Sequence, residues 1–220
     1  MFISNIIKPW CVYARAFFIF FFLSIVHSQN NRYERIVSES IQTIAINGNQ
    51  IFKIEVETHS SREILLRSKI DGEYQDLFQI TNSTEGSVLT FQLEENPVVS
   101  IPDDKRNAHK VVAATLRLTI PKDMNLDIVS DIASVKLKGS YRQLTIQLLE
   151  GFCEIYGEIY MATVNTVNGG ITVKTSRGEV SATSRYGKIK ADDFKRKEGK
   201  WLLQSIRGDI TVINEDDRQP

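Results

Sequence analysis

A repeat of eighteen residues fills the C-terminal half of the chain and restricts the folds that are open to it. Each copy begins with an apolar residue, and a three-residue insertion, Glu198 to Lys200, precedes the last copy. The five copies, here called blocks one to five, begin at Leu126, Leu144, Ala162, Val180 and Trp201. A fixed period of this length is typical of proteins that stack one structural unit on the next.

Apolar residues recur at positions one and three, and again at positions ten and twelve, of each block. Positions one and three hold Leu126 and Ile128, Leu144 and Ile146, Ala162 and Val164, Val180 and Ala182, and Trp201 and Leu203. Positions ten and twelve hold Val135 and Leu137, Cys153 and Ile155, Ile171 and Val173, Ile189 and Ala191, and Ile210 and Val212. The residues between them are mostly polar, and this alternation with a period of two predicts strands with one face in the core.

A small residue at position eight separates the two predicted strands of each block. The five residues at this position are Ala133, Gly151, Gly169, Gly187 and Gly208. A tight corner needs a small residue or a positive φ, which glycine adopts at little cost. Two short strands and two turns per block predict an all-β fold, namely a two-sided β-solenoid of about five 18-residue rungs over residues 126–218.

The rungs of such a solenoid stabilise one another. A single rung exposes its backbone edges and covers only one side of its apolar residues, so it needs neighbouring rungs about 4.8 Å away. We therefore expect the position-ten side chains to touch in a row, and these are Val135, Cys153, Ile171, Ile189 and Ile210. Each large aliphatic side chain that is buried contributes about 1.5 to 3 kcal/mol, so Ile171→Asp is expected to unfold the protein.

The segment before the repeat is also rich in predicted strands but lacks the eighteen-residue period. Asn47 and Gly48, between the apolar run Ile44 to Ile46 and the alternating run Ile51 to Glu57, predict a hairpin. Further strands are predicted at Glu63 to Lys69, Phe78 to Thr81, Ser87 to Leu93 and Val111 to Ile120, with a tight turn at Asp71 and Gly72 and a loop from Glu94 to Lys110. We interpret residues 29–110 as an irregular β-meander that caps the N-terminal end of a solenoid domain, residues 111–220, whose last residues form a short polar tail.

The N-terminus has the pattern of a secretory signal peptide. Lys8 and Arg15 precede an apolar run from Ala16 to Val26, and the small residue Ser28 follows. The run is shorter than the roughly 20 residues that a spanning helix needs. We therefore predict removal of residues 1–28 and a location in the periplasm, on the cell surface or outside the cell, with no transmembrane segment in the mature chain.

The composition of the predicted mature chain excludes a disulfide framework. Only Cys153 is left once Cys11 is removed with the signal peptide. The whole chain has 27 basic and 27 acidic residues, and losing Lys8 and Arg15 leaves a formal net charge of −2. The overall charge therefore indicates no particular partner.

The rungs resemble those of the bacterial putative-adhesin β-strand-repeat family, a domain of unknown function in exported envelope proteins. The resemblance covers about residues 115–214. It rests on Ile120, Pro121 and Lys122, on Gly170, Ile171, Val173 and Thr175, on Gly178, Val180, Ala182 and Thr183, on Gly187, Ile189 and Ala191, and on Gly208, Ile210 and Val212. It implies a β-solenoid fold and an envelope location, and it implies no catalytic or binding residues.

Residue types that carry chemistry are sparse, and we predict no catalytic, cofactor-binding or metal-binding residue. His59 and His109 have no partners at the spacing of a metal site or an acid–base pair. Cys153 occupies an inward position, which favours a buried structural thiol over a nucleophile. The turns lack the repeated Gly- and Asp-rich corners of calcium-binding β-rolls, although Asp192 and Asp193 could form a weak site.

One stretch of the repeat is strongly basic. Between Lys174 and Arg207 there are ten basic and four acidic residues. Seven of the basic residues are candidates for contact with an anionic surface, and they are Lys188, Lys190, Lys195, Arg196, Lys197, Lys200 and Arg207. In an exported protein such a surface would meet an acidic glycan, lipid headgroups or another envelope protein and not nucleic acid. A solvated face that prevents aggregation of the sheet is the competing interpretation.

These patterns favour a non-enzymatic, exported envelope protein with an adhesin-like surface or scaffold that binds a partner or a glycan. A first alternative is an accessory of an envelope-stress or signalling system. A second is a small polysaccharide-acting enzyme, because parallel β-helices include lyases and hydrolases. Such an enzyme needs several carboxylates on adjacent rungs, and in this chain Glu154 and Asp192 are the candidates.

Overall fold

The computed structural model describes residues 30–72, 75–99 and 113–216, whose regular structure is β-strand apart from one short 3-10 helix, so the all-β prediction is confirmed. The strands are β1 (Asn30–Val37), β2 (Thr43–Asn47), β3 (Ile51–His59), β4 (Glu63–Asp71), β5 (Phe78–Glu85), β6 (Val88–Glu95), β7 (Ala113–Pro121), β8 (Met124–Ser130), β9 (Ser134–Glu150), β10 (Cys153–Asn168), β11 (Ile171–Thr175), β12 (Glu179–Ser184), β13 (Ile189–Ala191), β14 (Lys200–Ser205) and β15 (Ile210–Asn214). A short 3-10 helix, η1 (Gln75–Leu77), precedes β5.

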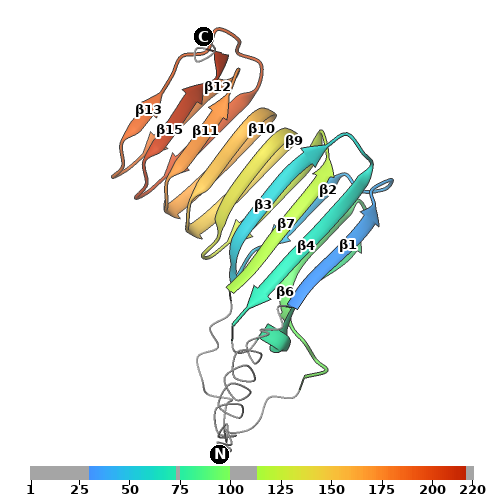
Figure 1. Cartoon of the computed structure of the whole chain (residues 1–220). Coiled ribbons are helices and arrows are strands. Elements are labelled where there is room, and N and C mark those ends of the chain that lie inside the picture. Colours follow the sequence, from blue (N-terminus) through green and yellow to red (C-terminus); the bar gives the residue numbers. More distant parts are fainter. Residues whose placement is uncertain (1–29, 73–74, 100–112, 217–220) are drawn as a thin grey trace, which may run out of the picture.

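The strands form two layers that share β9 and β10 (Figure 1). The front layer has the order β1-β4-β7-β3-β9-β10-β11-β15-β13. The back layer has the order β5-β6-β2-β8-β9-β10-β14-β12. β9 and β10 pass from the front layer to the back layer at Gly139 and Gly157, where φ is +128° and +131°, values that suit glycine. The core lies between the two layers.

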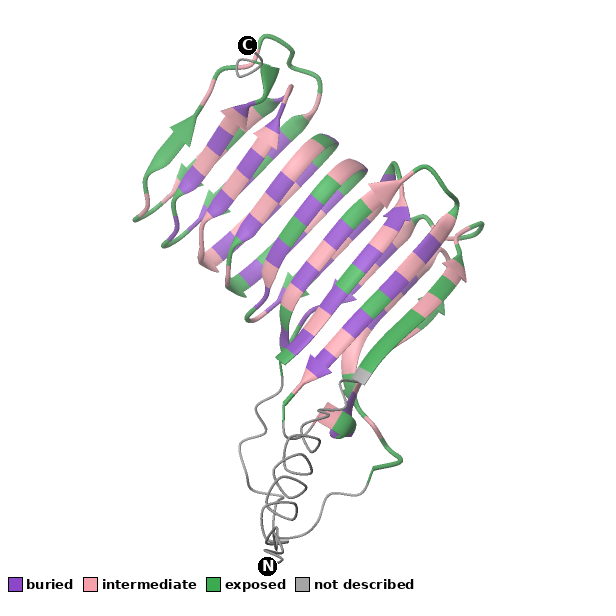
Figure 2. Cartoon of the chain, viewed as in Figure 1, coloured by how far each residue is buried: buried purple, intermediate pink, exposed green. Residues whose placement is uncertain are grey.

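Blocks one to three stack with the predicted offset of eighteen residues. Cys153 lies beside Val135 on one side and Ile171 on the other, in parallel register. In the back layer Leu144 lies between Leu126 and Ala162 in the same way. The inward residues of these three blocks are buried, as the alternation along the strands in Figure 2 shows. The sequence period therefore gives the correct register for this part of the molecule.

Blocks four and five are stacked in the opposite order from the one that the sequence predicts. Ile171 pairs with Ile210 of block five, and Ile210 pairs with Ile189 of block four. In the back layer Trp201 of block five lies between Ala162 and Val180. The prediction of one row in the order of the sequence is wrong at its last two members. Block five is inserted between blocks three and four.

The sizes of the inward residues explain this order. Trp201, Leu203, Ile210 and Val212 of block five are 0–1% exposed, because strands cover them on both sides. The inward residues of block four include two alanines, and its Ile189 is 45% exposed at the end of the stack. Burying the block with the larger side chains removes more apolar surface from water. The eight residues 192–199 between β13 and β14 give the chain the length to return past block four.

Position eight forms a ladder of small residues along one side of the molecule. A Cβ atom on Gly151 would lie 2.1 Å from the carbonyl oxygen of Ala133, and one on Gly169 would lie 1.7 Å from that of Gly151. The ladder continues with Gly208 against Gly169 and Gly187 against Gly208, so it follows the same inverted order. Glycine is needed there because the backbones of neighbouring blocks approach closely.

The hairpin predicted around Asn47 and Gly48 is wrong. β2 pairs in parallel with β6 and β8 in the back layer, whereas β3 pairs with β7 and β9 in the front layer. Ile44 therefore lies beside Leu126, and Ile54 beside Val135, as the inward residues of one more copy of the repeat would. Asn47 and Gly48 form a corner between the two layers and not a hairpin turn, because β2 and β3 each pair with an apolar strand of block one, in different layers.

The other strands predicted before the repeat are present as β4, β5, β6 and β7. β4 pairs antiparallel with both β1 and β7, and β5 pairs antiparallel with β6. These antiparallel strands form the N-terminal end of the two layers. Both layers continue from this segment into the repeat, and the division into domains at residue 110 stays a prediction.

Several predictions concern residues outside the described ranges. They are the signal peptide with its cleavage site at Ser28, most of the loop Glu94 to Lys110 with His109, and the end of the polar tail, residues 217–220. Among the described residues no helix has the length and the apolar character that crossing a membrane would require.

Candidate functional site

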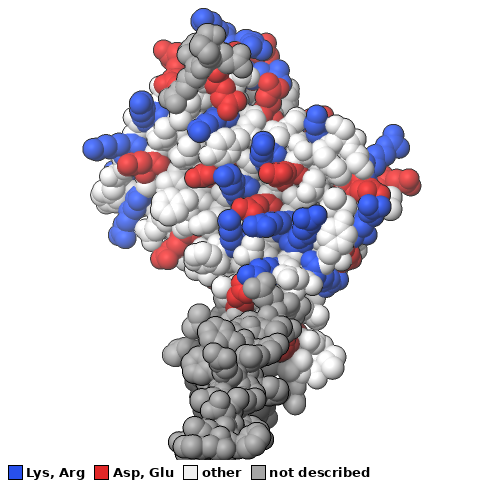
Figure 3. Space-filling model, viewed as in Figure 1, with Lys and Arg blue, Asp and Glu red and all other residues white. Residues whose placement is uncertain are grey.

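The outer faces of the two layers have different chemistry. On the front layer, Lys and Arg alternate with Asp and Glu (Figure 3). Many of these charges are paired: Glu55 lies 2.6 Å from Lys53 and 2.5 Å from Arg117, and Glu154 lies 3.8 Å from Lys136. The hydrogen bond from Lys53, assisted by Arg117, holds the pKa of Glu55 below its usual value against the opposing effect of burial. Neighbouring side chains therefore neutralise part of the charge on the front face.

The back layer presents hydroxyl and carboxamide groups where the front layer presents charges. Two outward rows cross all eight of its strands. One row consists of Ser83, Thr90, Ala45, Asp127, Thr145, Thr163, Leu202 and Ser181. The other consists of Thr81, Gln92, Asn47, Val129, Gln147, Asn165, Gln204 and Thr183. Asp127 is the single ionisable residue in these two rows.

A groove of about 700 Å³ runs across the strands of the back layer, and we call it the back groove. Its lining residues come from blocks one to five together with Asn49, and they are Asn49, Val129, Ser130, Asp131, Gln147, Leu148, Leu149, Asn165, Thr166, Val167, Thr183, Arg185, Gln204, Ser205 and Ile206. Asp131 of block one and Arg185 of block four are the charged members. Blocks two, three and five lie between them and contribute no charged residue, so the middle of the groove carries no charge.

The inverted order of the last two blocks creates the chemistry of this groove. Gln147, Asn165 and Gln204 lie on adjacent strands because block five follows block three in space. If the blocks were stacked in sequence order, Thr183 would separate the last two carboxamides. The same inversion affects position six of the blocks. It places Ile206 of block five next to Val167 of block three, so that Leu149, Val167 and Ile206 form an apolar row that Arg185 of block four does not interrupt.

One polar atom in the groove has no hydrogen-bond partner. The side-chain oxygen of Asn165 is buried and accepts no hydrogen bond within the described residues. A buried acceptor in this state costs about 1 to 3 kcal/mol relative to a satisfied one. Because Asn165 lies between Gln147 and Gln204, a donor on a bound molecule could satisfy it after rotation of the carboxamide.

Hydroxyl groups hold the corner next to the back groove. The Thr166 hydroxyl donates to the carbonyl oxygen of Gly169 at 2.7 Å, and the Ser205 hydroxyl donates to the same oxygen at 3.2 Å. The Ser184 hydroxyl donates to the carbonyl oxygen of Gly208 at 2.8 Å. These bonds fix the ends of the strands that carry the carboxamides, so the row of carboxamides is part of a rigid element.

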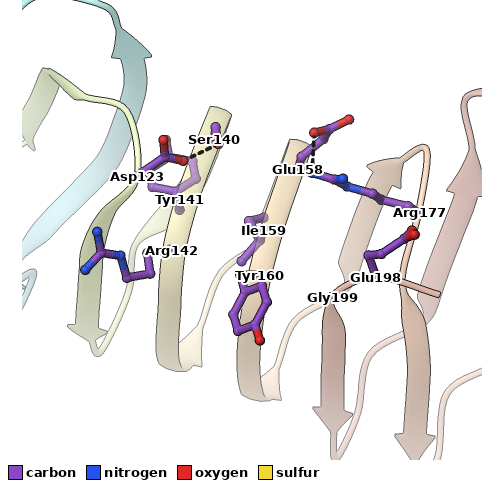
Figure 4. A pocket seen from close by; sticks show the side chains of 10 residues that line it. All are labelled: Asp123, Ser140, Tyr141, Arg142, Glu158, Ile159, Tyr160, Arg177, Glu198 and Gly199. Carbon is purple, nitrogen blue, oxygen red and sulfur yellow. Dashed lines mark hydrogen bonds and ion pairs between the residues drawn. The ribbon is translucent and has the colours of Figure 1, made fainter. Parts of the chain in front are cut away.

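A second groove, of about 670 Å³, lies at the opposite edge of the strands, and we call it the edge groove (Figure 4). Its charged groups are largely engaged with neighbours. Glu158 pairs with Arg177 at 2.7 Å and accepts a hydrogen bond from Ser176 at 3.2 Å. The Ser140 hydroxyl donates to Asp123 at 2.7 Å, as the dashed line in Figure 4 shows. These contacts favour a structural role for the polar residues of the edge groove.

The seven basic residues singled out from the sequence are all exposed, and they fall into two groups. Lys188 and Arg207 lie at the corners that precede β13 and β15, and Lys190 lies on β13. Lys195, Arg196, Lys197 and Lys200 follow β13, at the opposite end of the strands. Arg196 pairs with Asp216 at 2.8 Å. The structure thus does not bring all seven together, and their binding to anions stays a prediction.

The two carboxylates considered for an enzyme lie on the front layer. Glu154 is on β10, and Asp192 directly follows β13, three strand positions away across β11 and β15. Three spacings of about 4.8 Å separate these strands by roughly 14 Å, which exceeds the distance between the two carboxyl groups of a glycosidase. Asp192 also accepts a hydrogen bond from the backbone of Asn214 at 3.0 Å.

The other residues considered for chemistry, His59 and Cys153, have surroundings that favour a structural role. His59 contacts the carbonyl oxygen of Glu63 at 2.6 Å, at the turn between β3 and β4. Cys153 is buried in the core, and burial, followed by the nearby charge of Glu154, raises the pKa of its thiol. Among the described residues no three His, Cys, Asp or Glu side chains gather in a group that could hold a metal ion.

The back groove was not predicted from the sequence, although one signal was present. Position four of the blocks reads Val129, Gln147, Asn165, Thr183 and Gln204, a column that is uncharged and polar in all blocks except the first. A polar outward column is expected of any strand with a wet face, so it does not by itself distinguish a site. The adjacency of the three carboxamides depends on the inverted block order, and the repeat does not reveal that order.

A solved structure of a bacterial protein shares this fold. A putative cell adhesion protein from Clostridium sporogenes has a TM-score of 0.59 at 7% sequence identity, with 84% of this chain and 98% of that chain covered. A putative adhesin from Bacteroides fragilis has a TM-score of 0.35 at 10% identity, with 84% and 97% covered. No family model matches the sequence, and no curated protein matches it. At these identities the first similarity shows an adhesin-like fold and nothing about a ligand.

Proposed function

We propose that this chain is a non-enzymatic, exported envelope protein that uses the back groove to bind an extended partner on an adhesin-like surface. The observation that carries the proposal is the row of Gln147, Asn165 and Gln204 on adjacent strands, with the unsatisfied oxygen of Asn165 at its centre. A buried polar atom without a partner needs an explanation, and a hydrogen bond from a bound molecule supplies one.

The architecture supports a binding scaffold. We interpret the two layers as a two-sided β-solenoid in which β2 and β3 add a rung before block one and block five is inserted before block four. Each rung pairs with its neighbours along both layers, so residues on adjacent rungs hold fixed spacings of about 4.8 Å. A rigid, evenly spaced surface of this kind lowers the entropic cost of holding an extended ligand.

Export rests on the predicted signal peptide. We expect the mature protein to begin at Gln29, outside the cytoplasm. N-terminal sequencing of the protein recovered from a bacterial expression host measures this directly. A product that keeps Met1 and stays in the cytoplasm would remove the envelope location from the proposal.

The binding function can be tested with beads coated with the mature chain. The attachment of the beads to the surfaces of intact bacterial and animal cells is measured. The wild type is compared with the triple variant Gln147→Ala, Asn165→Ala and Gln204→Ala. The matched control changes three uncharged outward residues of the front layer, Thr119→Ala, Thr172→Ala and Thr211→Ala. We expect the back-groove variant to lose attachment and the control to keep it. Equal attachment by wild type and back-groove variant would exclude the back groove as the binding surface.

A further inference from the structure

We infer that the ligand of the back groove is an uncharged, polyhydroxylated polymer, a neutral glycan chain that lies across the strands; this inference rests on the proposed function. It names the ligand class that the proposal leaves open. It also differs from the acidic ligands that the basic residues of the sequence suggest.

The groove offers a strongly charged polymer of either sign a single opposite charge. Arg185 is the one cation among the lining residues, and Asp131 on the opposite outermost rung repels anions. A polyanion would gain one ion pair and would lose the hydration of its other charges, which is costly without partners. An uncharged chain pays no such cost along the middle of the groove.

The carboxamides match the hydroxyl groups of sugars. A carboxamide offers two N–H donors and an acceptor oxygen, whereas each sugar hydroxyl both donates and accepts. Gln147, Asn165 and Gln204 repeat this combination at the strand spacing of about 4.8 Å, which is close to the length of one hexose unit in an extended chain. A sugar hydroxyl is also a suitable donor for the unsatisfied oxygen of Asn165.

The wall of the groove suits the apolar faces of sugar rings. Leu149 is 52% exposed and Ile206 is 42% exposed, and Val167 lies on the rung between them. Side chains of this size that face water on a folded surface are available to cover the C–H groups of a ring. The carboxamide row and the apolar row run in parallel, so one extended chain can contact both.

A peptide fits the groove less well. Extended peptides are held mainly by backbone hydrogen bonds to an exposed strand edge. In the back groove the backbones of β9, β10 and β14 are paired on both sides, so they offer no edge. The groove spans five strands from β8 to β12, or roughly 19 Å, which corresponds to a short stretch of a longer polymer.

The inference can be tested by measuring the affinity of the mature chain for soluble polysaccharides. The neutral probes are dextran, mannan and a β-1,3-glucan, and the acidic probes are polygalacturonate and hyaluronate. We expect at least one neutral polymer to bind, with little change between low and high salt. The double variant Asn165→Ala and Gln204→Ala should bind it at least tenfold more weakly, because two hydrogen-bonding side chains are lost. The control Thr172→Ala and Thr211→Ala should bind as the wild type does.

Each outcome is decisive. Binding of acidic polymers alone, lost at high salt, would overturn the inference, and so would neutral binding that the double variant leaves unchanged. If no polysaccharide binds while the bead assay still shows attachment that depends on the groove, the neutral-glycan inference fails and the proposed function stands. Thermal unfolding of both variants, followed by circular dichroism, establishes that they are folded.

Discussion

Blocks one to three and blocks four and five share the same pattern of apolar residues but are assembled differently. In the first group each block pairs with the next one in the sequence, at an offset of eighteen residues. In the second group Ile210 of block five lies between Ile171 and Ile189. A repeat thus determines which residues face the core, whereas the size of those residues and the length of the connections determine which blocks are neighbours.

The largest effect that separates the two groups is expected from a charge at position ten. Ile171→Asp and Ile210→Asp place a carboxylate between strands on both sides, at sites that are 0% exposed. Each should cost more than about 4 kcal/mol, enough to unfold a domain of ordinary stability. Urea denaturation followed by circular dichroism measures this loss.

Ile189→Asp is the matched control for these two variants. Ile189 has the same sequence position in its block but is 45% exposed at the end of the stack, so the loss should stay below about 1 kcal/mol. A loss for Ile189→Asp that equals the loss for Ile210→Asp would contradict the inverted order.

A smaller difference is expected between the position-one residues of blocks four and five. Trp201 is 1% exposed and fills the back layer between Ala162 and Val180, so Trp201→Ala should cost about 3 to 5 kcal/mol. Val180 is partly buried and has a strand on one side, so Val180→Ala should cost less than about 1.5 kcal/mol. Comparable shifts in the midpoint of thermal unfolding would show that block four is as well covered as block five.

The glycine ladder tests the close contact between blocks two, three and five. The Cβ atom of Gly169→Ala would lie 1.7 Å from the carbonyl oxygen of Gly151, so blocks two and three must move apart. The free energy of unfolding should therefore fall by about 1 to 3 kcal/mol. In Gly170→Ala the nearest atom is 3.3 Å away, and the free energy of unfolding should change by less than about 1 kcal/mol. Equal free energies of unfolding for the two variants would contradict the backbone contact between Gly169 and Gly151.

The smallest effect on stability is expected in the connection that follows block four. Lys195→Glu, Arg196→Glu and Lys197→Glu together remove one exposed ion pair, Arg196 with Asp216, and should change stability by less than about 0.5 kcal/mol. The same triple variant tests the prediction of an anionic contact. Binding of the wild type to anionic liposomes should fall with salt and should be absent in the variant, and equal binding would dispose of that contact.

Much of the fold follows from the sequence because burial alternates along a strand with a period of two. The inward residues of blocks one to three, the corner glycines and strands β4 to β7 are where the patterns place them. The hairpin at Asn47 and the order of the last blocks were wrong, because a turn signal does not say which strand pairs with which. Among the partner strands of β2 and β3, β8 and β9 lie about 80 residues away in the sequence, in block one.

The candidate site was harder to predict, because it also depends on which strands are neighbours. Its carboxamides belong to three blocks, and their adjacency follows from the insertion of block five, which the sequence shows only as the extra residues Glu198 to Lys200 and as the larger side chains Trp201 and Leu203. The basic residues were conspicuous in the sequence, yet β13 separates them into two groups.

Cross-linking of engineered cysteines tests the inverted order most directly. The outward residues Thr172 and Thr211 lie on adjacent strands, and Thr211 in turn pairs with Lys190. Cα atoms on adjacent strands are about 5 Å apart and those two strands away about 10 Å apart, and a disulfide needs less than about 7 Å. Mild oxidation should therefore link Thr172→Cys with Thr211→Cys and leave Thr172→Cys with Lys190→Cys unlinked, as measured by mass spectrometry. A disulfide in the second pair and none in the first would contradict the account.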